Sequence, residues 1–207
     1  MNLLRFARDT YRHRRTVETL LNNHQTFTRH REATLWGCMS QQKTDELVRL
    51  VEQARQHEGP IIEIGTLFGI TAQAIASAKR PEQSLITVDN YSWNPFCMPA
   101  ADHREFTRRA LDYCVRHAGV EIFDGTSEEF FAGYAGAPPA LVFLDGSHRY
   151  EHVSAELRHA RRLGARILCG DDYCPGPFPG LVRAISEEIG PEIRVTHDVW
   201  SWTAPSP

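Results

Sequence analysis

Apolar positions along the chain follow two alternating patterns. Some recur with the helical spacing i, i+3, i+4, i+7, and others form short unbroken runs that are typical of strands buried on both faces. The strand-like runs cover residues 61–64, 85–88, 120–123, 140–144 and 165–169, with a late strand or hairpin over 193–202. The helical stretches cover residues 44–54, 70–78, 102–114, 127–131, 153–160 and 181–189. This alternation predicts an α/β fold with a doubly wound, mostly parallel sheet.

Two connections in this pattern have features of their own. Residues 90–101 contain Trp93 and two prolines and show no period, so they predict a loop after the second strand. Asp102 is followed three residues later by Glu105, which resembles a capping box and predicts that a helix starts there.

Charge is distributed unevenly along the 207 residues. The net charge is −3, but residues 1–35 hold seven arginines and three acids, which leaves −7 on the remainder. Four of these arginines recur at helical spacing, namely Arg5, Arg8, Arg12 and Arg15. The stripe is either a solvated helix face or an arm that binds a partner or covers a substrate. We therefore divide the chain into an N-terminal helical extension, residues 1–40, and a sheet domain, residues 41–207.

Composition excludes several classes of protein. The slight acidic excess argues against a dedicated nucleic-acid-binding protein, which would carry a basic excess. The longest apolar stretch, residues 138–144, is too short to span a membrane, and the N-terminus lacks the pattern of a secretion signal. Five cysteines without a CxxC pair are typical of reduced thiols, so we expect a cytoplasmic protein.

Polar or glycine residues follow every strand of the predicted sheet. In an open α/β sheet, ligands bind outside the carboxyl ends of the strands. A single aspartate at such a place is often only a helix cap or a turn residue, but this explanation is strained when five strands end in this way. The residues concerned include Glu63, Gly65, Thr66, Gly69 and Thr71, then Asp89, then Asp124, Gly125, Thr126 and Ser127, then Asp145 and His148, and finally Asp171 and Asp172.

The loop after the first strand, residues 65–69, has glycines that let its backbone approach a ligand at a helix N-terminus. It is not GxGxxG, because Leu67 stands at the second glycine position, so a pyrophosphate is a poorer ligand for it. Asp89, at the end of the next strand, suits two ribose hydroxyls because a carboxylate accepts two hydrogen bonds. Together these features suit an adenosine-containing cofactor.

Three carboxylates follow the fourth and fifth strands. Neighbouring parallel strands lie ~4.8 Å apart, so Asp145, Asp171 and Asp172 can converge. Carboxylates at one place repel one another unless a cation neutralises them, and an all-oxygen set suits Mg²⁺. The alternative is that Asp171 caps the next segment and Asp172 is exposed.

Several of these stretches together resemble one superfamily. They are IIEIGTLFGITAQAIA, LITVD, GTSEEF, LVFLDGSHRYEHVSAEL and ILCGDDY. They resemble class I S-adenosylmethionine (SAM)-dependent methyltransferases, with their Rossmann-like fold, over roughly residues 40–190. Within that superfamily the chain is similar to small metal-dependent O-methyltransferases, both the catechol and caffeoyl-CoA type and the macrocin type that methylates sugar hydroxyls.

The resemblance implies roles for individual residues. Glu63 and Gly65 shape the pocket for the methionine end of the cofactor, Thr71 contacts its carboxylate, and Asp89 binds the ribose. The implied cofactor-binding set is Glu63, Gly65, Thr66, Gly69, Thr71, Asp89, Gly125, Thr126, Ser127 and Asp145, with the adenine lined by residues 125–127.

The implied metal ligands are Asp145, Asp171 and Asp172. The third is asparagine in the catechol type, so Asp172 follows the macrocin type. His148 lies where the catechol type has its lysine base, and it is either the catalytic base, beside Asp145, or a structural residue heading the next helix.

The implied activity is transfer of a methyl group from SAM to a hydroxyl of a small sugar or phenolic molecule, with Mg²⁺ or another divalent cation. Residues 41–207 would form the catalytic domain. We expect no nucleic-acid partner. A homo-oligomer is possible under the resemblance, because family members are often dimers or larger. Three alternatives stay open: an enzyme resembling cephalosporin hydroxylase, a nicotinamide-dependent oxidoreductase, and a non-catalytic scaffold that binds the cofactor.

Overall fold

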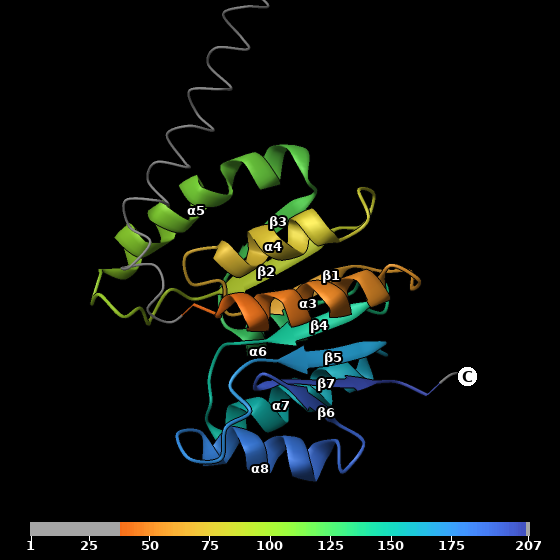
Figure 1. The fold of residues 1–207 in the computed structure, drawn as a ribbon. Helices are drawn as coiled ribbons and strands as arrows, with labels where there is room; N and C mark the ends of the chain where they lie inside the picture. The colour runs from red at the N-terminus through yellow and green to blue at the C-terminus, as the bar shows by residue number, and fades with distance from the viewer. Residues whose placement is uncertain (1–37, 206–207) are drawn as a thin grey trace, which may run out of the picture. The chain divides into compact units, whose positions relative to one another are not determined.

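The computed structural model describes residues 38–205, whose centre is a seven-stranded sheet with the strand order β3-β2-β1-β4-β5-β7-β6 (Figure 1). The first five strands are parallel, and β7 and β6 complete the sheet as antiparallel strands. The bounds are β1 Ile61–Ile64, β2 Leu85–Asp89, β3 Val120–Asp124, β4 Leu141–Leu144, β5 Ile167–Gly170, β6 Arg194–Thr196 and β7 Val199–Thr203. The predicted mostly parallel α/β fold is confirmed, and its strand order reverses between β1 and β4.

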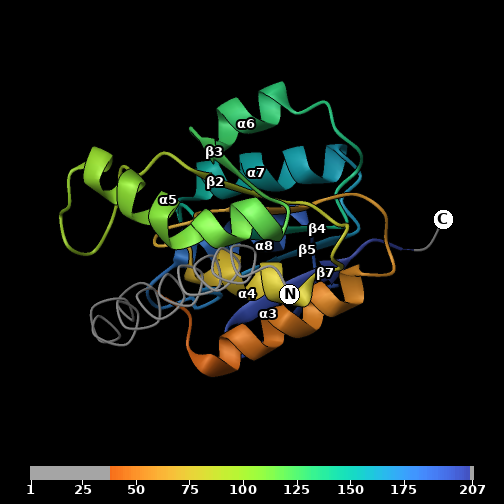
Figure 2. The same ribbon diagram turned by 90° about the horizontal axis from the view of Figure 1, so that it is seen from above.

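Helices cover both faces of the sheet (Figure 2). On one face lie α3 Gln41–Ala54, α4 Ile70–Ala78 and α5 Ala100–His117, and on the other lie α6 Ser127–Gly133, α7 Tyr150–Arg162 and α8 Pro179–Glu188. Successive strand residues point to opposite faces, so Ile61 joins the core under α3 and Ile62 the core under α7. Every residue of β1, β4 and β5 is buried, which is why these strands read as unbroken apolar runs.

The start of α5 differs from the prediction. The capping box at Asp102 is not formed, because α5 begins at Ala100, directly after Pro99, and Asp102 lies in its first turn. Proline suits a helix start, where backbone N–H groups have no helical partner. The predictions for residues 1–37, including the basic stripe, lie outside the described residues.

The late strand is a hairpin, with His197 and Asp198 at its turn in the left-handed region. This hairpin buries Trp200 completely against β5. A Cβ on Gly170 would lie 2.3 Å from Leu144 O and 2.6 Å from Trp200 Nε1, so only glycine fits at the end of β5. The fit of Trp200 therefore fixes the position from which Asp171 and Asp172 leave the sheet.

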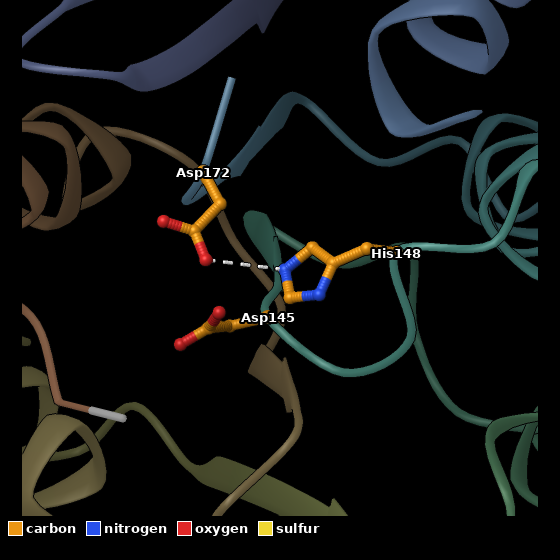
Figure 3. Close-up of side chains that lie close together, drawn as sticks. All are labelled: Asp145, His148 and Asp172. Carbon is orange, nitrogen blue, oxygen red and sulfur yellow. Dashed lines mark ion pairs between the residues drawn. The ribbon is translucent and has the colours of Figure 1, made fainter. Parts of the chain in front are cut away.

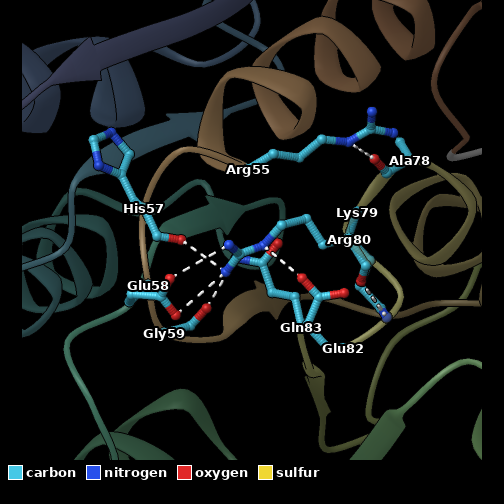
Figure 4. A network of polar contacts seen from close by, with 9 residues as sticks. All are labelled: Arg55, His57, Glu58, Gly59, Ala78, Lys79, Arg80, Glu82 and Gln83. Carbon is cyan, nitrogen blue, oxygen red and sulfur yellow. Dashed lines mark hydrogen bonds and ion pairs between the residues drawn. The ribbon is translucent and has the colours of Figure 1, made fainter.

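The loops that precede β1 and β2 are joined by a polar network (Figure 4). Arg80 lies 3.4 Å from the Glu58 carboxylate and donates to His57 O over 3.3 Å, while Gln83 donates to Gly59 O over 2.9 Å. These contacts stabilise the amino ends of the two strands, opposite the edge where ligands bind in such sheets. Among the described helices, none is long and apolar enough to cross a membrane.

Candidate active site

The carboxyl ends of β1 and β4 meet at the point where the strand order reverses. Gly65 follows β1 with φ +95°, and a Cβ there would lie 2.3 Å from Asp145 O. The Asp145 N–H donates to Ile64 O over 2.8 Å, which continues the ladder between the two strands. A side chain at residue 65 would separate the strands, so this glycine allows the loop of residues 65–69 and Asp145 to lie side by side.

Asp89, predicted to bind a ribose, accepts hydrogen bonds from the loop of residues 65–69 in this structure. Its Oδ2 accepts hydrogen bonds from the backbone N–H groups of Thr66 and Leu67, over 2.9 and 2.8 Å. Its Oδ1 accepts one from Tyr91 N over 2.7 Å. A carboxylate oxygen has two lone pairs, so Oδ1 keeps capacity for one further hydrogen bond.

Leu67 has an unusual backbone conformation that α5 stabilises. Its φ is 47°, which is uncommon for a residue with a branched side chain. Two side chains of α5, both fully buried, reach its carbonyl oxygen: Thr107 Oγ1 donates over 2.5 Å, and His103 Nε2 lies 2.9 Å away. Because a carbonyl only accepts, His103 Nε2 carries the proton. The loop is therefore fixed by β2 on one side and by α5 on the other.

Glu63 lies wholly buried on β1, in register with Thr87 of β2. Its carboxyl accepts a hydrogen bond from Thr87 Oγ1, and its Oε1 has no partner among the described residues. Burial raises the pKa of Glu63 to about 8; the Thr87 hydrogen bond opposes this rise, and the negative charge of Asp89 adds to it. A protonated carboxyl in this place can donate a hydrogen bond as well as accept one.

The residues predicted to line an adenine lie at the start of α6. Thr126 is the N-cap and forms a reciprocal capping box with Glu129. Ser127 Oγ donates over 2.6 Å to Glu156, a buried residue of α7. Burial raises the pKa of Glu156 to about 7, against the effects of the Ser127 hydrogen bond and of His148. The hydroxyls of Thr126 and Ser127 thus make structural contacts, while Gly125 remains half-buried.

Asp145, His148 and Asp172 come together beyond the ends of β4 and β5 (Figure 3). One donor atom from each lies within 4.8 Å of the others, and His148 Nε2 is 3.3 Å from Asp172 Oδ2. The His148 ring stacks on Phe178, with ring centres 4.2 Å apart. The pKa of Asp145 is raised well above its usual value, because its carboxyl is desolvated and lies near the charges of Asp171 and Asp172. The group has the composition of a cation site, with two carboxylates and one imidazole.

The predicted metal set of Asp145, Asp171 and Asp172 stays a prediction, and Asp171 lies close to this group. Asp171, only 5% exposed, is paired with Lys43, whose Nζ lies 2.7 Å from its Oδ1. His148, predicted as a base or as a structural residue, presents a ring nitrogen to this group. Asp172 has φ 62°, in the left-handed region, and its Oδ1 and the Oδ1 of Asp171 both face Lys43 Nζ.

Lys43 is the residue of this region that sequence reasoning missed. Its Nζ also lies 3.0 Å from Asp172 Oδ1, so it bridges both aspartates. Burial acts to lower its pKa, but the hydrogen bonds and charges of the two aspartates outweigh burial and raise it. The sequence contained one signal for this contact. Lys43 lies one helical turn before Leu47, on the apolar face of α3, where an unpaired lysine is costly, so a partner for it was to be expected.

The comparisons with known proteins agree with the fold. The model of a methyltransferase-domain family matches residues 62–171. A search of curated proteins gives no match. Among solved structures, the chain is similar to TomG from Streptomyces achromogenes, an O-methyltransferase of tomaymycin synthesis solved with SAM, with 20% identity over 89% of this chain and 87% of that chain and a TM-score of 0.63.

Two further solved structures are similar to a comparable degree. An O-methyltransferase from Bacillus cereus, solved with SAH, is 18% identical over 89% of each chain, with a TM-score of 0.63. CalS11, a TDP-rhamnose 3'-O-methyltransferase of calicheamicin biosynthesis, is 18% identical over 90% of this chain and 86% of that chain, with a TM-score of 0.60. Because the family model covers more than half of the chain, and because the sheet has the class I strand order, the protein belongs to the methyltransferase-domain family.

Proposed function

We propose that the protein is a SAM-dependent O-methyltransferase that uses a divalent cation to act on a hydroxyl of a small sugar or phenolic molecule. The observation that carries the proposal is the group formed by Asp145, His148 and Asp172, which lies beside the glycine loop at the switch point of the sheet. A cofactor bound at that loop and a cation bound by this group would lie next to each other, as methyl transfer to an oxygen requires.

The cofactor would bind between the loop and the ends of β1 to β3. Gly65, Thr66, Gly69 and Thr71 would surround its methionine end, and residues 125–127 its adenine. Oδ1 of Asp89 can accept one ribose hydroxyl while the carboxylate continues to bind the loop. Glu63, with one free oxygen, would face the amino end of the cofactor from within the strand.

The residues present fit a divalent cation. Asp145, His148 and Asp172 would hold it, and the His148 Nε2 atom faces Asp172 Oδ2 over 3.3 Å. A set of one nitrogen and two carboxylates suits Mn²⁺ or Zn²⁺ as well as Mg²⁺. When bound, the cation lowers the pKa of a nearby hydroxyl, and SAM supplies an electrophilic methyl group.

His148 has two roles that exclude each other. The Nε2 atom that faces the aspartates would either bind the cation or accept the proton of the acceptor hydroxyl. We assign it to the cation, and the base role is the alternative. Loss of a base changes the pH dependence of turnover, whereas loss of a ligand changes cation affinity.

The acceptor would enter beside the loop between β2 and α5. Trp93 is 64% exposed there, and Phe96 is 42% exposed and packs on Phe68 with ring centres 5.7 Å apart. An exposed aromatic face near the reacting centre supports a sugar or phenolic ring as the acceptor. The activity of CalS11 on TDP-rhamnose makes nucleotide-linked sugars the first candidates to test, with catechols second.

Calorimetric titration of the purified protein with S-adenosylhomocysteine and with NAD tests the cofactor, and we expect binding of the first only. Methyl transfer to a panel of nucleotide-linked sugars and catechols, with Mn²⁺ or with EDTA, tests the class of acceptor and the need for a cation. Binding of NAD in place of S-adenosylhomocysteine would favour the oxidoreductase. Methyl transfer that persists in EDTA would contradict the proposed need for a divalent cation. His148→Ala distinguishes its two roles, because only loss of a ligand weakens Mn²⁺ binding.

A further inference from the structure

The imidazole of His148 lies in a partly open part of the structure, and two contacts set its orientation. Its side chain is 27% exposed, and rotation about the bond that carries the ring has broad minima, so contacts must hold the ring plane. The ring stacks on Phe178, with ring centres 4.2 Å apart and 26° between the ring planes. Its Nε2 faces Asp172 Oδ2 over 3.3 Å (Figure 3). Phe178 therefore sets the plane of the imidazole, and Asp172 sets which edge faces the site.

Both contacts come from the loop between β5 and α8, and hydrogen bonds order that loop. The Cys174 N–H donates to Asp172 O over 2.6 Å, and the Phe178 N–H donates to Cys174 O over 3.0 Å. The Tyr173 N–H donates over 2.9 Å to Asp198 O, in the turn between β6 and β7. The segment that brings a carboxylate to the site thus also brings the ring that supports His148.

The helix that follows Phe178, α8, packs closely on the backbone that carries His148. A Cβ on Gly180 would lie 3.2 Å from His148 O and 3.1 Å from Tyr150 N, so the two segments touch there. The Tyr150 hydroxyl donates to Glu187 over 2.5 Å, and the Arg183 guanidinium lies 4.5 Å from the centre of the Tyr150 ring. Packing of α8 on this segment therefore supports the stack.

We propose that Phe178 is a positioning residue that holds the His148 imidazole with Nε2 towards the aspartates. This inference rests on the proposed function, which gives that nitrogen a role as a cation ligand or as a base. Both roles depend on direction, because the lone pair of the nitrogen must point at the ion or at the proton that it accepts. Phe178 acts through His148 in either case and does not itself touch a reacting atom.

Two substitutions of Phe178 and one matched control test the proposal. Phe178→Leu removes the aromatic face but keeps apolar bulk, whereas Phe178→Tyr keeps the face. Phe131→Leu is the control, because Phe131 also stacks on a histidine, with its ring centre 5.4 Å from that of His159, in the last turn of α7. Each variant is made alone and combined with His148→Ala. The measurements are Mn²⁺ affinity by calorimetry and kcat at saturating Mn²⁺ and acceptor.

We expect Phe178→Leu to lose about tenfold in the quantity that His148→Ala reduces, which is Mn²⁺ affinity for a ligand and kcat for a base. Phe178→Tyr should stay within about threefold of the wild type, since it keeps the aromatic face. Phe131→Leu should lower stability but change neither quantity. Combined with His148→Ala, Phe178→Leu should cause no further loss, because no imidazole is left to orient.

Two results would overturn the proposal. One is a Phe178→Leu protein that matches the wild type in both Mn²⁺ affinity and kcat. The other is a loss that adds in full to that of His148→Ala, because Phe178 would then act independently of the imidazole. Thermal melts show whether each variant is folded, and Phe178→Met replaces Phe178→Leu if that variant is not.

NMR of the histidine rings gives a second measurement that needs neither the ion nor an acceptor. The His148 signals are those that disappear in His148→Ala. Stacking should shift its ring protons upfield in the wild type and in Phe178→Tyr but not in Phe178→Leu, and a wild type without this shift would overturn the proposal. Titration with S-adenosylhomocysteine keeps the two proposals separate, because failure of the wild type to bind it would contradict only the proposed function.

Discussion

The buried carboxyl of Glu63 makes a quantitative prediction about stability. Its pKa rises from 4.5 to about 8 in the folded protein, with burial as the main cause. Below pH 4.5 the group is protonated in both the folded and the unfolded state, so it adds no pH dependence to the stability. Between pH 4.5 and 8 the unfolded state releases the proton that the folded state keeps, so stability falls as pH rises and levels off above pH 8.

The size of this effect follows from the difference between the two pKa values. At about 1.4 kcal/mol per pH unit, the free energy of unfolding falls by at most about 5 kcal/mol over this range. Glu63→Gln keeps the shape of the protonated side chain and an acceptor for Thr87, but it has no proton to lose. The variant should therefore resemble the wild type near pH 4.5 and become progressively more stable than it towards pH 8.

Urea unfolding of both proteins at pH 5, 6, 7 and 8 measures the difference directly. Comparing the two proteins cancels the titrating groups that do not interact with Glu63, such as Glu156. Asp145 is not cancelled, because the charge of Glu63 contributes to the rise of its pKa. Glu121→Gln, which removes an exposed carboxylate of β3, controls for the loss of one negative charge. If the stabilities of wild type and Glu63→Gln stay parallel across this range, the reasoning from burial is wrong.

Three further predictions concern the loop, the sheet and the acceptor. Thr107→Val removes a hydrogen bond to Leu67 O; we expect about 1 kcal/mol lower stability and weaker S-adenosylhomocysteine binding by calorimetry, and unchanged binding would contradict a role in fixing the loop. Gly170→Ala places a methyl group 2.3 Å from Leu144 O and should cost about 3 kcal/mol or more by urea unfolding; a loss under about 1 kcal/mol would show that the strand end can move. Trp93→Ala should raise the acceptor KM several-fold while leaving the affinity for S-adenosylhomocysteine unchanged, and an unchanged KM would place the acceptor elsewhere.

The sheet was predictable because its strands are short and buried on both faces. The apolar run of residues 61–64 is bounded by a proline and a glycine, which mark the strand ends. The structure places β1 over Ile61–Ile64. The start of α5 was not predictable in the same way, because Asp102 is suited to a cap but the helix already begins at Ala100, after Pro99. Local signals compete there, and the choice between them depends on packing.

The candidate site was predictable as a region but not in its contacts. Strand ends place Asp145 and the Asp171–Asp172 pair at one edge of the sheet. The left-handed backbone at Asp172 and the pairing of both aspartates with Lys43 are not revealed by residue type alone. Lys43 lies 129 residues before Asp172 in the chain, so only the folded structure shows that they touch.

The hydrogen bonds that hold the loop at Leu67 have a consequence for how a cofactor would bind. Asp89 fixes the loop through its N–H groups, and His103 and Thr107 fix it through its carbonyl oxygen, so its conformation exists before any ligand arrives. A ligand that enters a preorganised loop loses little conformational entropy in ordering it. If the cofactor binds there as proposed, the loop would act as a rigid template, and the buried side chains of α5 that hold it would contribute to affinity for a molecule that they do not touch.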